Sequence, residues 1–124
     1  MTLYESLLEA VTTEYDTLRV LKQSPRGTVS VVRHKKSGTR YIFRRYSGSG
    51  EVYRRLLPVL CPHLPQIMEA AEQDGQTAVL EEYVQGDTLA ELLTGARLTE
   101  REARQVTMQL CQALHVLHSM GAVH

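Results

Sequence analysis

Residues 98–124 read LTEREARQVTMQLCQALHVLHSMGAVH, and this stretch decides the fold. Thr99 is followed three positions later by Glu102, which is the spacing of a capping box at the start of a helix. Apolar residues then recur at helical spacing as far as Leu117, and Gly121 supplies a stop. The stretch therefore predicts a long amphipathic helix over residues 100–119.

A hairpin and a shorter helix are expected just before this long helix. Asp74-Gly75 separates two apolar runs, and this dipeptide suits a tight hairpin turn in which both central residues have positive φ. We predict strands over 66–73 and 76–83. Gly86-Asp87 then ends the second strand, and TLAELLTG predicts a helix over 88–95.

The amino-terminal half predicts two helices that flank three strands. Short runs rich in Val, Ile, Thr and Tyr are broken by the turn compositions QSPRG and HKKSG. The expected strands span 15–22, 28–34 and 39–46. The expected helices span 3–14 and 51–60, and Pro58 should bend or end the second of these.

Composition excludes several classes of partner. The 124 residues carry 14 Lys plus Arg and 14 Asp plus Glu, so the formal net charge is zero. A nucleic-acid or acidic-membrane binder normally carries a basic excess, so neither partner is expected. No apolar run reaches the ~20 residues that cross a bilayer, and the first residues lack the basic start of a secretory signal. We therefore expect a cytoplasmic protein in which Cys61 and Cys111 stay reduced.

The order of these elements, with the residues at their joints, resembles the amino-terminal lobe of a eukaryotic-type serine/threonine protein kinase. The resemblance covers about residues 15–124 and continues through the first two helices of the carboxy-terminal lobe. It implies an α+β fold with a five-stranded antiparallel sheet, one regulatory helix and two carboxy-lobe helices. It divides the chain into an amino-terminal helix (1–14), a kinase-like lobe (15–84) and a hinge end with truncated carboxy-lobe helices (85–124). The opening stretch resembles the helix that leads into the HRD catalytic motif, of which His124 is the first letter.

The resemblance aligns LKQSPRG with the glycine-rich loop that cradles phosphates. Lys22, Ser24 and Gly27 stand at its three glycine positions, so only the last glycine remains. Pro25 stiffens this loop and removes one N–H donor. An ordinary hairpin turn also explains the segment, and Lys22 and Arg26 would add positive charge to any phosphate site that remains.

The resemblance aligns Arg44 with the lysine that anchors the nucleotide phosphates. Arg keeps the charge but is a planar fork instead of a compact donor. Ile42 stands where the family uses a small alanine beside the adenine, so both residues argue against efficient nucleotide chemistry. Glu51 is the expected salt-bridge partner of Arg44, or else a helix amino-terminal carboxylate stabilised by the helix dipole. Glu81 either pairs with Arg44 or faces solvent.

The hinge of the resemblance falls on Glu82 and Val84, whose backbone groups would face an adenine whatever their side chains. The complete nucleotide-binding set that the resemblance implies is Leu21, Gly27, Val29, Ile42, Arg44, Glu51, Glu82 and Val84.

Cys111, His115 and His118 share one face of the long predicted helix. Thiolate and imidazole groups suit zinc, but a fourth ligand is absent from the neighbouring sequence. The alternative is a packed or solvated helix face, and we expect no metal site.

Two functional hypotheses follow. In protein kinases the catalytic aspartate, the asparagine and the magnesium-binding aspartate follow the HRD histidine. We therefore expect a truncated kinase-like domain with at most weak ATP binding, little role for Mg²⁺ and no phosphoryl transfer by itself. Its parent would be a serine/threonine kinase or a pseudokinase. The alternative is a non-catalytic interaction module that forms oligomers, or binds a protein partner, through residues 88–119. A less favoured possibility is an unrelated small α+β binding protein.

Overall fold

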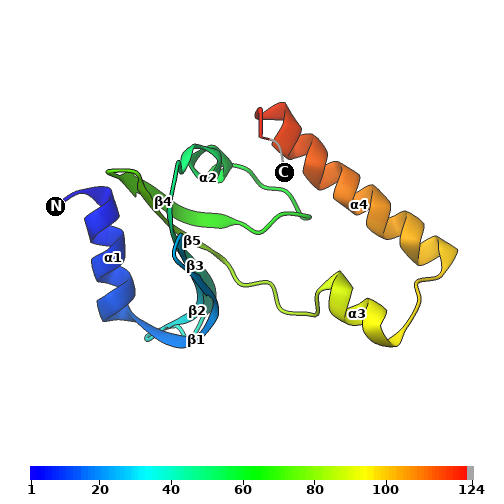
Figure 1. Ribbon diagram of the computed structural model, residues 1–124, viewed down its shortest axis with the longest axis horizontal. Coiled ribbons are helices and arrows are strands. Elements are labelled where there is room, and N and C mark those ends of the chain that lie inside the picture. The colour runs from blue at the N-terminus through cyan, green and yellow to red at the C-terminus, as the bar shows by residue number, and fades with distance from the viewer. Residues whose placement is uncertain (123–124) are drawn as a thin grey trace. The chain divides into compact units, whose positions relative to one another are not determined.

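The computed structural model describes residues 1–122, and Figure 1 shows the order of its helices and strands. The expected helix over 3–14, the 76–83 strand and the 100–119 helix are all present. His124, which the resemblance places at the start of the HRD motif, lies outside the described residues. The elements are α1 (Leu3–Glu14), β1 (Tyr15–Ser24), β2 (Gly27–His34), β3 (Arg40–Ser47), α2 (Glu51–Leu56), β4 (Ile67–Gln73), β5 (Gln76–Glu82), α3 (Leu89–Gly95) and α4 (Glu100–Ser119).

The chain forms two compact units. The first comprises Met1–Leu60 and Pro65–Tyr83, and it holds α1, α2 and the whole sheet. The second comprises Cys61–Leu64 and the chain from Val84 onward, and it holds α3 and α4.

The sheet of the first unit has five antiparallel strands in the order β1-β2-β3-β5-β4. This confirms the α+β class and the five-stranded antiparallel sheet predicted from the sequence. One row of paired residues crosses four strands, from Lys22 through Val29 and Arg44 to Val79. Side chains alternate between the two faces along each strand, so this row points to one face of the sheet.

Helix α1 packs on the opposite face of the sheet. Tyr4 and Leu7 are buried against Val32, Phe43 and Leu80 in one apolar cluster. The phenolic oxygen of Tyr4 lies 3.5 Å from Nη2 of Arg45, on the strand β3. The amino-terminal helix is therefore part of the first unit's core.

A second apolar cluster lies on the face that bears Arg44 and Val79. Ile67, Ala70 and Val79 form its buried centre. Tyr46 from β3 and Tyr53 from α2 pack against this centre, with ring centroids 6.1 Å apart. Helix α2 thus lies along this face, and the sheet separates it from α1 (Figure 1).

Local turn and cap signals account for most element boundaries. Asp74 and Gly75 have φ values of 51° and 76°, which confirms the tight β4–β5 turn. Helix α2 ends at Leu56, two residues before Pro58, which confirms that Pro58 ends the helix, although the outer limit of residue 60 was too long. Pro58 has no backbone N–H to donate to the carbonyl four residues earlier, and its ring would clash with that carbonyl, so the helix cannot continue through it.

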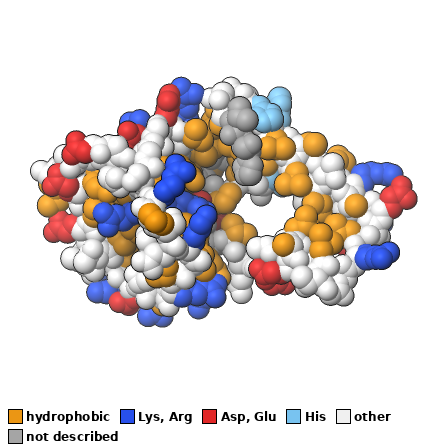
Figure 2. Space-filling view, viewed as in Figure 1, with side chains coloured by type: hydrophobic (Ala, Val, Ile, Leu, Met, Phe, Trp, Pro, Cys, Tyr) orange, Lys and Arg blue, Asp and Glu red, His pale blue; other side chains and the backbone are white. Residues whose placement is uncertain are grey.

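The second unit consists of two capped helices. Thr88 caps α3, and Thr99 with Glu102 forms the predicted capping box at the start of α4. Both helices leave large apolar side chains exposed, as Figure 2 shows for their surface. Among the described residues, no helix is both long enough and apolar enough to cross a membrane.

Candidate functional site

The segment aligned with the glycine-rich loop is a tight hairpin. Strands β1 and β2 pair up to Ser24 and Gly27, so only Pro25 and Arg26 form the turn. Lys22 and Ser24 are part of the ladder instead of a loop that arches over a ligand. The segment is therefore not a glycine-rich loop whose backbone N–H groups could approach a phosphate closely.

Gly27 is required by the packing of the neighbouring strand. A Cβ atom at Gly27 would lie 2.0 Å from the Arg45 carbonyl oxygen and 2.7 Å from the Tyr46 Cα. No real Cβ makes such contacts, so only glycine lets β2 approach β3 at this point. The close approach accounts for this glycine without any ligand.

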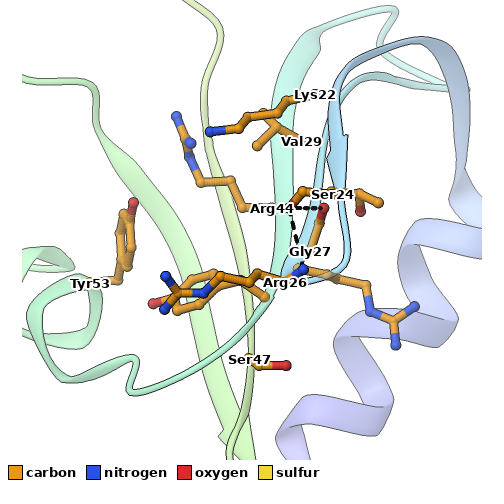
Figure 3. Close-up of a pocket in the computed structure, with 11 residues that line it drawn as sticks. Lys22, Ser24, Arg26, Gly27, Val29, Arg44, Ser47 and Tyr53 are labelled. Atoms are coloured by element: carbon orange, nitrogen blue, oxygen red, sulfur yellow. Dashed lines mark hydrogen bonds between the residues drawn. The ribbon is translucent and has the colours of Figure 1, made fainter.

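A pocket of about 270 Å³ lies beside this hairpin on the sheet (Figure 3). In the figure, Lys22 and Arg44 extend side by side toward the side on which Tyr53 lies. Strands β1, β2 and β3 supply most of its walls and α2 supplies one ring. The lining residues are Lys22, Ser24, Arg26, Gly27, Thr28, Val29, Arg44, Arg45, Tyr46, Ser47 and Tyr53.

The charge of this pocket is entirely positive. Its described lining holds four cations, Lys22, Arg26, Arg44 and Arg45, and no Asp or Glu. The other lining residues with polar side chains all carry hydroxyl groups, and they are Ser24, Thr28, Tyr46, Ser47 and Tyr53. In a chain of zero net charge, this clustering creates a local positive potential that attracts anions.

Arg44 pairs with Glu81, which settles one of the alternatives left open by the sequence. Its Nε donates to Oε1 of Glu81 on β5. The Glu81 side chain is only 6% exposed and that of Arg44 is 36% exposed, so the pair lies at the edge of the core. No described residue other than Glu81 receives a hydrogen bond from the Arg44 guanidinium.

The expected Arg44–Glu51 ion pair is therefore absent from the described structure. Glu51 is exposed at the first position of α2, where its Oε1 pairs with Arg55 one turn later. Arg44 lies opposite Val79, so Glu81 is the diagonal cross-strand neighbour of Arg44 on the same face. The Arg44 guanidinium therefore pairs with Glu81 on the neighbouring strand, while Glu51 lies at the surface at the start of α2.

Four other residues of the predicted set lie on β1, β2 and β3. Val29 lines the pocket, as does Gly27. Ile42 lies opposite Glu81 and shares its face with Arg44, but it does not line the pocket. Leu21 is unpaired at a register shift between Val20 and Lys22, and it is exposed outside the pocket. A bulge of this kind turns a side chain away from its regular face.

The two hinge residues fall in different units. Glu82 ends β5, where its N–H donates to the Gln66 carbonyl and its carboxylate accepts from the Gln66 N–H. Val84 is exposed at the start of the second unit's main segment.

Sequence reasoning missed Tyr46 and Tyr53 as pocket residues. The Tyr46 hydroxyl donates to the Ser49 carbonyl oxygen over 2.8 Å, and burial is the main cause that raises the pKa of Tyr46. Tyr46 therefore stays protonated at neutral pH. The signal was present, because Arg44 and Tyr46 are two apart in one strand and so share a face.

The predicted cluster on the long helix does not form a metal-binding group. No group of three or more His, Cys, Asp or Glu side chains among residues 1–122 is arranged to hold a metal ion. Cys111, His115 and His118 are all exposed along α4.

The chain has a five-stranded antiparallel sheet with one helix on its pocket face, and two helices follow this sheet. This arrangement is typical of the protein kinase fold. Residues 26–124 match the protein kinase domain family. The chain belongs to that family, which confirms the resemblance seen in its sequence.

The relatives show how much of a kinase the chain represents. It is 23% identical to Rho-associated protein kinase let-502 of Caenorhabditis briggsae, with 98% of this chain and 12% of that protein covered. It is 25% identical to Rho-associated protein kinase 1 of Homo sapiens, with 90% of this chain and 9% of that protein covered. The chain thus spans about a tenth of the length of these relatives.

A solved structure shows the same fold. The crystal structure of Rad53 residues 1–466 in complex with AMP-PNP matches with a TM-score of 0.73 at 19% identity. The match covers 94% of this chain and 34% of that one. The described chain is therefore the amino-terminal portion of a protein kinase fold.

Proposed function

We propose that this chain binds an adenine nucleotide weakly at the pocket beside the β1–β2 hairpin and transfers no phosphate by itself. The observation that carries the proposal is the pocket itself, with four cations and no carboxylate in its described lining. A structural relative was crystallised with AMP-PNP, which supports a nucleotide as the ligand.

Three departures from an efficient nucleotide site make the binding weak. The hairpin at Pro25 and Arg26 offers no arch of glycine N–H groups. Arg44 shares its guanidinium with buried Glu81. Ile42 places a branched side chain where a small residue would leave room for the adenine ring. Each of these reduces the contact between protein and nucleotide.

The proposed lack of phosphoryl transfer rests on the family's division of labour. The catalytic base and the magnesium ligands of protein kinases come from the catalytic loop and the DFG segment. Both segments correspond to positions after residue 124, so these 124 residues by themselves lack them. The longer protein in which such a chain functions would be a serine/threonine kinase or a pseudokinase.

Calorimetric titration of the whole chain with ATP tests the nucleotide proposal. We expect a dissociation constant on the order of 1 mM, because few direct contacts are available. Ile42→Ala should tighten ATP binding severalfold by opening space beside the adenine. Val20→Ala is the matched control, since Val20 is exposed and pairs with Ser30 in a row on the other face.

Two results would contradict this proposal. The first is no detectable heat at 10 mM ATP for either the wild type or Ile42→Ala. The second is incorporation of labelled phosphate into a generic acceptor protein when the purified chain is incubated with ATP and Mg²⁺. The wild type and a heat-denatured sample would be compared in the second assay.

A second candidate function is self-association through the second unit. Its support is the exposure of large apolar side chains on both helices, which a solvated helix pair rarely leaves uncovered. These side chains are Leu89, Leu92, Leu93, Met108 and Leu110. We place the chain in the cytoplasm, with a second copy or a protein partner on this surface and with no nucleic-acid or membrane partner.

Light scattering at tens of micromolar tests this second function. We expect a dimer or higher oligomer, and Leu110→Glu should shift it toward monomer. Gln109→Glu is the matched control, because it adds the same charge at the neighbouring exposed position. A wild-type mass near 14.0 kDa would overturn self-association.

A further inference from the structure

We propose that the nucleotide binds this pocket as a free polyphosphate, without a divalent metal ion. Lys22, Arg26 and Arg44 take the role of countercharge that Mg²⁺ has in most nucleotide sites. This inference rests on the proposed function and specifies the ionic form of the ligand that the same site selects.

The register of the sheet brings Lys22 and Arg44 together. Lys22 pairs with Val29, and Val29 pairs with Arg44, so one row carries a cation on each side of a valine. Neighbouring strands lie about 4.8 Å apart, so the two Cα atoms are about 10 Å apart. Both side chains extend toward the same side in Figure 3. They can thus contact one polyphosphate together.

Lys22 and Arg26 have no competing anion in the described structure, and Arg44 has one, Glu81. No described acceptor takes a hydrogen bond from the side chains of Lys22 or Arg26, because only the backbone of Arg26 is bonded. Arg44 bonds Glu81 through Nε alone, which leaves its two terminal amino groups directed to no described acceptor. Arg45 is turned to the other face, where it meets Tyr4.

The same lining is unsuited to Mg²⁺. That ion prefers carboxylate and water oxygens in an octahedral shell. No Asp or Glu belongs to the described lining, and the acid nearest in the ladder, Glu81, is already paired. The positive side chains of Lys22, Arg26 and Arg44 would also repel a divalent cation. A nucleotide with bound Mg²⁺ has a smaller negative charge than the free nucleotide, so the pocket attracts it less.

Titration calorimetry on the whole chain tests the inference, with ATP in EDTA and with ATP in excess Mg²⁺. We expect binding in EDTA to be about fivefold tighter than in Mg²⁺, since free ATP is the more highly charged ligand. Affinity should fall in the order ATP, ADP, AMP. Inorganic tripolyphosphate, used as a probe, should compete with ATP in EDTA. Raising the salt concentration should weaken binding.

Charge-removal variants locate the site. Lys22→Ala and Arg26→Ala should each weaken ATP binding in EDTA about fivefold, as expected for partly exposed charge-assisted contacts. Lys36→Ala is the matched control, because it removes the same charge from the turn at the far end of β2. That turn lies roughly 20 Å from the pocket, at about 3.4 Å per strand residue. Circular dichroism would establish that all variants fold.

The outcomes separate this inference from the proposed function. Binding that occurs only with Mg²⁺ would overturn the inference and leave weak nucleotide binding in place. Lys22→Ala and Arg26→Ala variants that bind like Lys36→Ala would also overturn it. No binding in either buffer would overturn the proposed function itself. Tighter binding in EDTA that Lys22→Ala and Arg26→Ala weaken would support both.

Discussion

Arg44 and Glu81 form an ion pair that lies diagonally across two neighbouring strands of the sheet. Arg44 stands opposite Val79 in the β3–β5 register, and Glu81 is two residues further along β5. The carboxylate is buried and the guanidinium reaches the surface. The pair therefore joins two strands within one sheet and leaves helix α2 outside this interaction.

Replacing Arg44 and replacing Glu81 should lower the free energy of unfolding by different amounts. Arg44→Met leaves a buried carboxylate without its partner, and we expect a loss of about 2–3 kcal/mol in the free energy of unfolding. Glu81→Gln keeps an oxygen acceptor and leaves a guanidinium that water can reach, so it should cost only about 1 kcal/mol. Urea denaturation measures both.

The double variant Arg44→Met/Glu81→Leu is the control for this pair. It replaces both charges by apolar groups, so it should be more stable than Arg44→Met alone. Equal stability of the single and double variants would show that the buried carboxylate was not the source of the cost.

Gly27→Ala should destabilise the first unit by about 2–3 kcal/mol, because the new methyl group would collide with the Arg45 carbonyl oxygen. Thermal unfolding followed by circular dichroism measures the loss. Gly95→Ala serves as the matched control, since a Cβ at Gly95 meets nothing within 4 Å. The control should be neutral or slightly stabilising. A Gly27→Ala protein as stable as Gly95→Ala would contradict the close approach of β2 and β3.

Thr77→Val should cost about 1–2 kcal/mol in the free energy of unfolding. The buried Thr77 Oγ1 donates to the Gly48 carbonyl over 2.7 Å and so holds the loop before α2. Valine has the same shape but leaves that carbonyl without this donor. Thr94→Val, at an exposed helix position, should change stability by less than about 0.5 kcal/mol. Similar losses for both variants would count against a specific role for Thr77.

Helix α4 should lose stability in acid through Glu102. Its carboxylate accepts from the Thr99 backbone N–H and meets the Thr99 side chain, and both contacts hold the pKa of Glu102 below its ordinary value of 4.5. A lowered folded-state pKa means that the stabilisation is present above pH 4.5 and is lost as the pH falls through the folded-state value.

Circular dichroism at 222 nm from pH 7 to pH 2 measures this effect. Glu102→Gln keeps the hydrogen-bonding group but does not titrate, so the wild type should have the higher helicity at neutral pH. The difference between the two proteins should vanish at the acid end. A constant difference at all pH values would contradict the assignment to this carboxylate.

Most elements followed from local signals in the sequence. The caps at Thr88 and Thr99 act within four residues, and the turn at Asp74-Gly75 needs only its own backbone angles. The 3–14 and 100–119 helices were predicted with their observed bounds for this reason. The end of α2 near Pro58 was also predicted, because a proline constrains the residues before it, although the helix ends before residue 60, the outer limit of the predicted span.

The site was less accessible to sequence reasoning, because its contacts join distant segments. Val29, Gly27 and Arg44 were predicted and line the pocket, whereas Leu21 was removed from it by one bulge in β1. A single inserted residue reverses the face of a side chain, and no local signal marks where the bulge falls.

By itself, the sequence determined the order of the elements, the protein kinase family and the charge of the hairpin. Each element and the hairpin depend on residues close together in the chain, and the family follows from the order of these local motifs along it. Only the tertiary structure decided which carboxylate holds Arg44 and that Lys22, Arg26 and Arg44 share one pocket. The sequence favoured Glu51 and left Glu81 either to pair with Arg44 or to face solvent, and the choice between the two acids depends on strand register. Register is set by the burial of the whole sheet, which no single segment encodes.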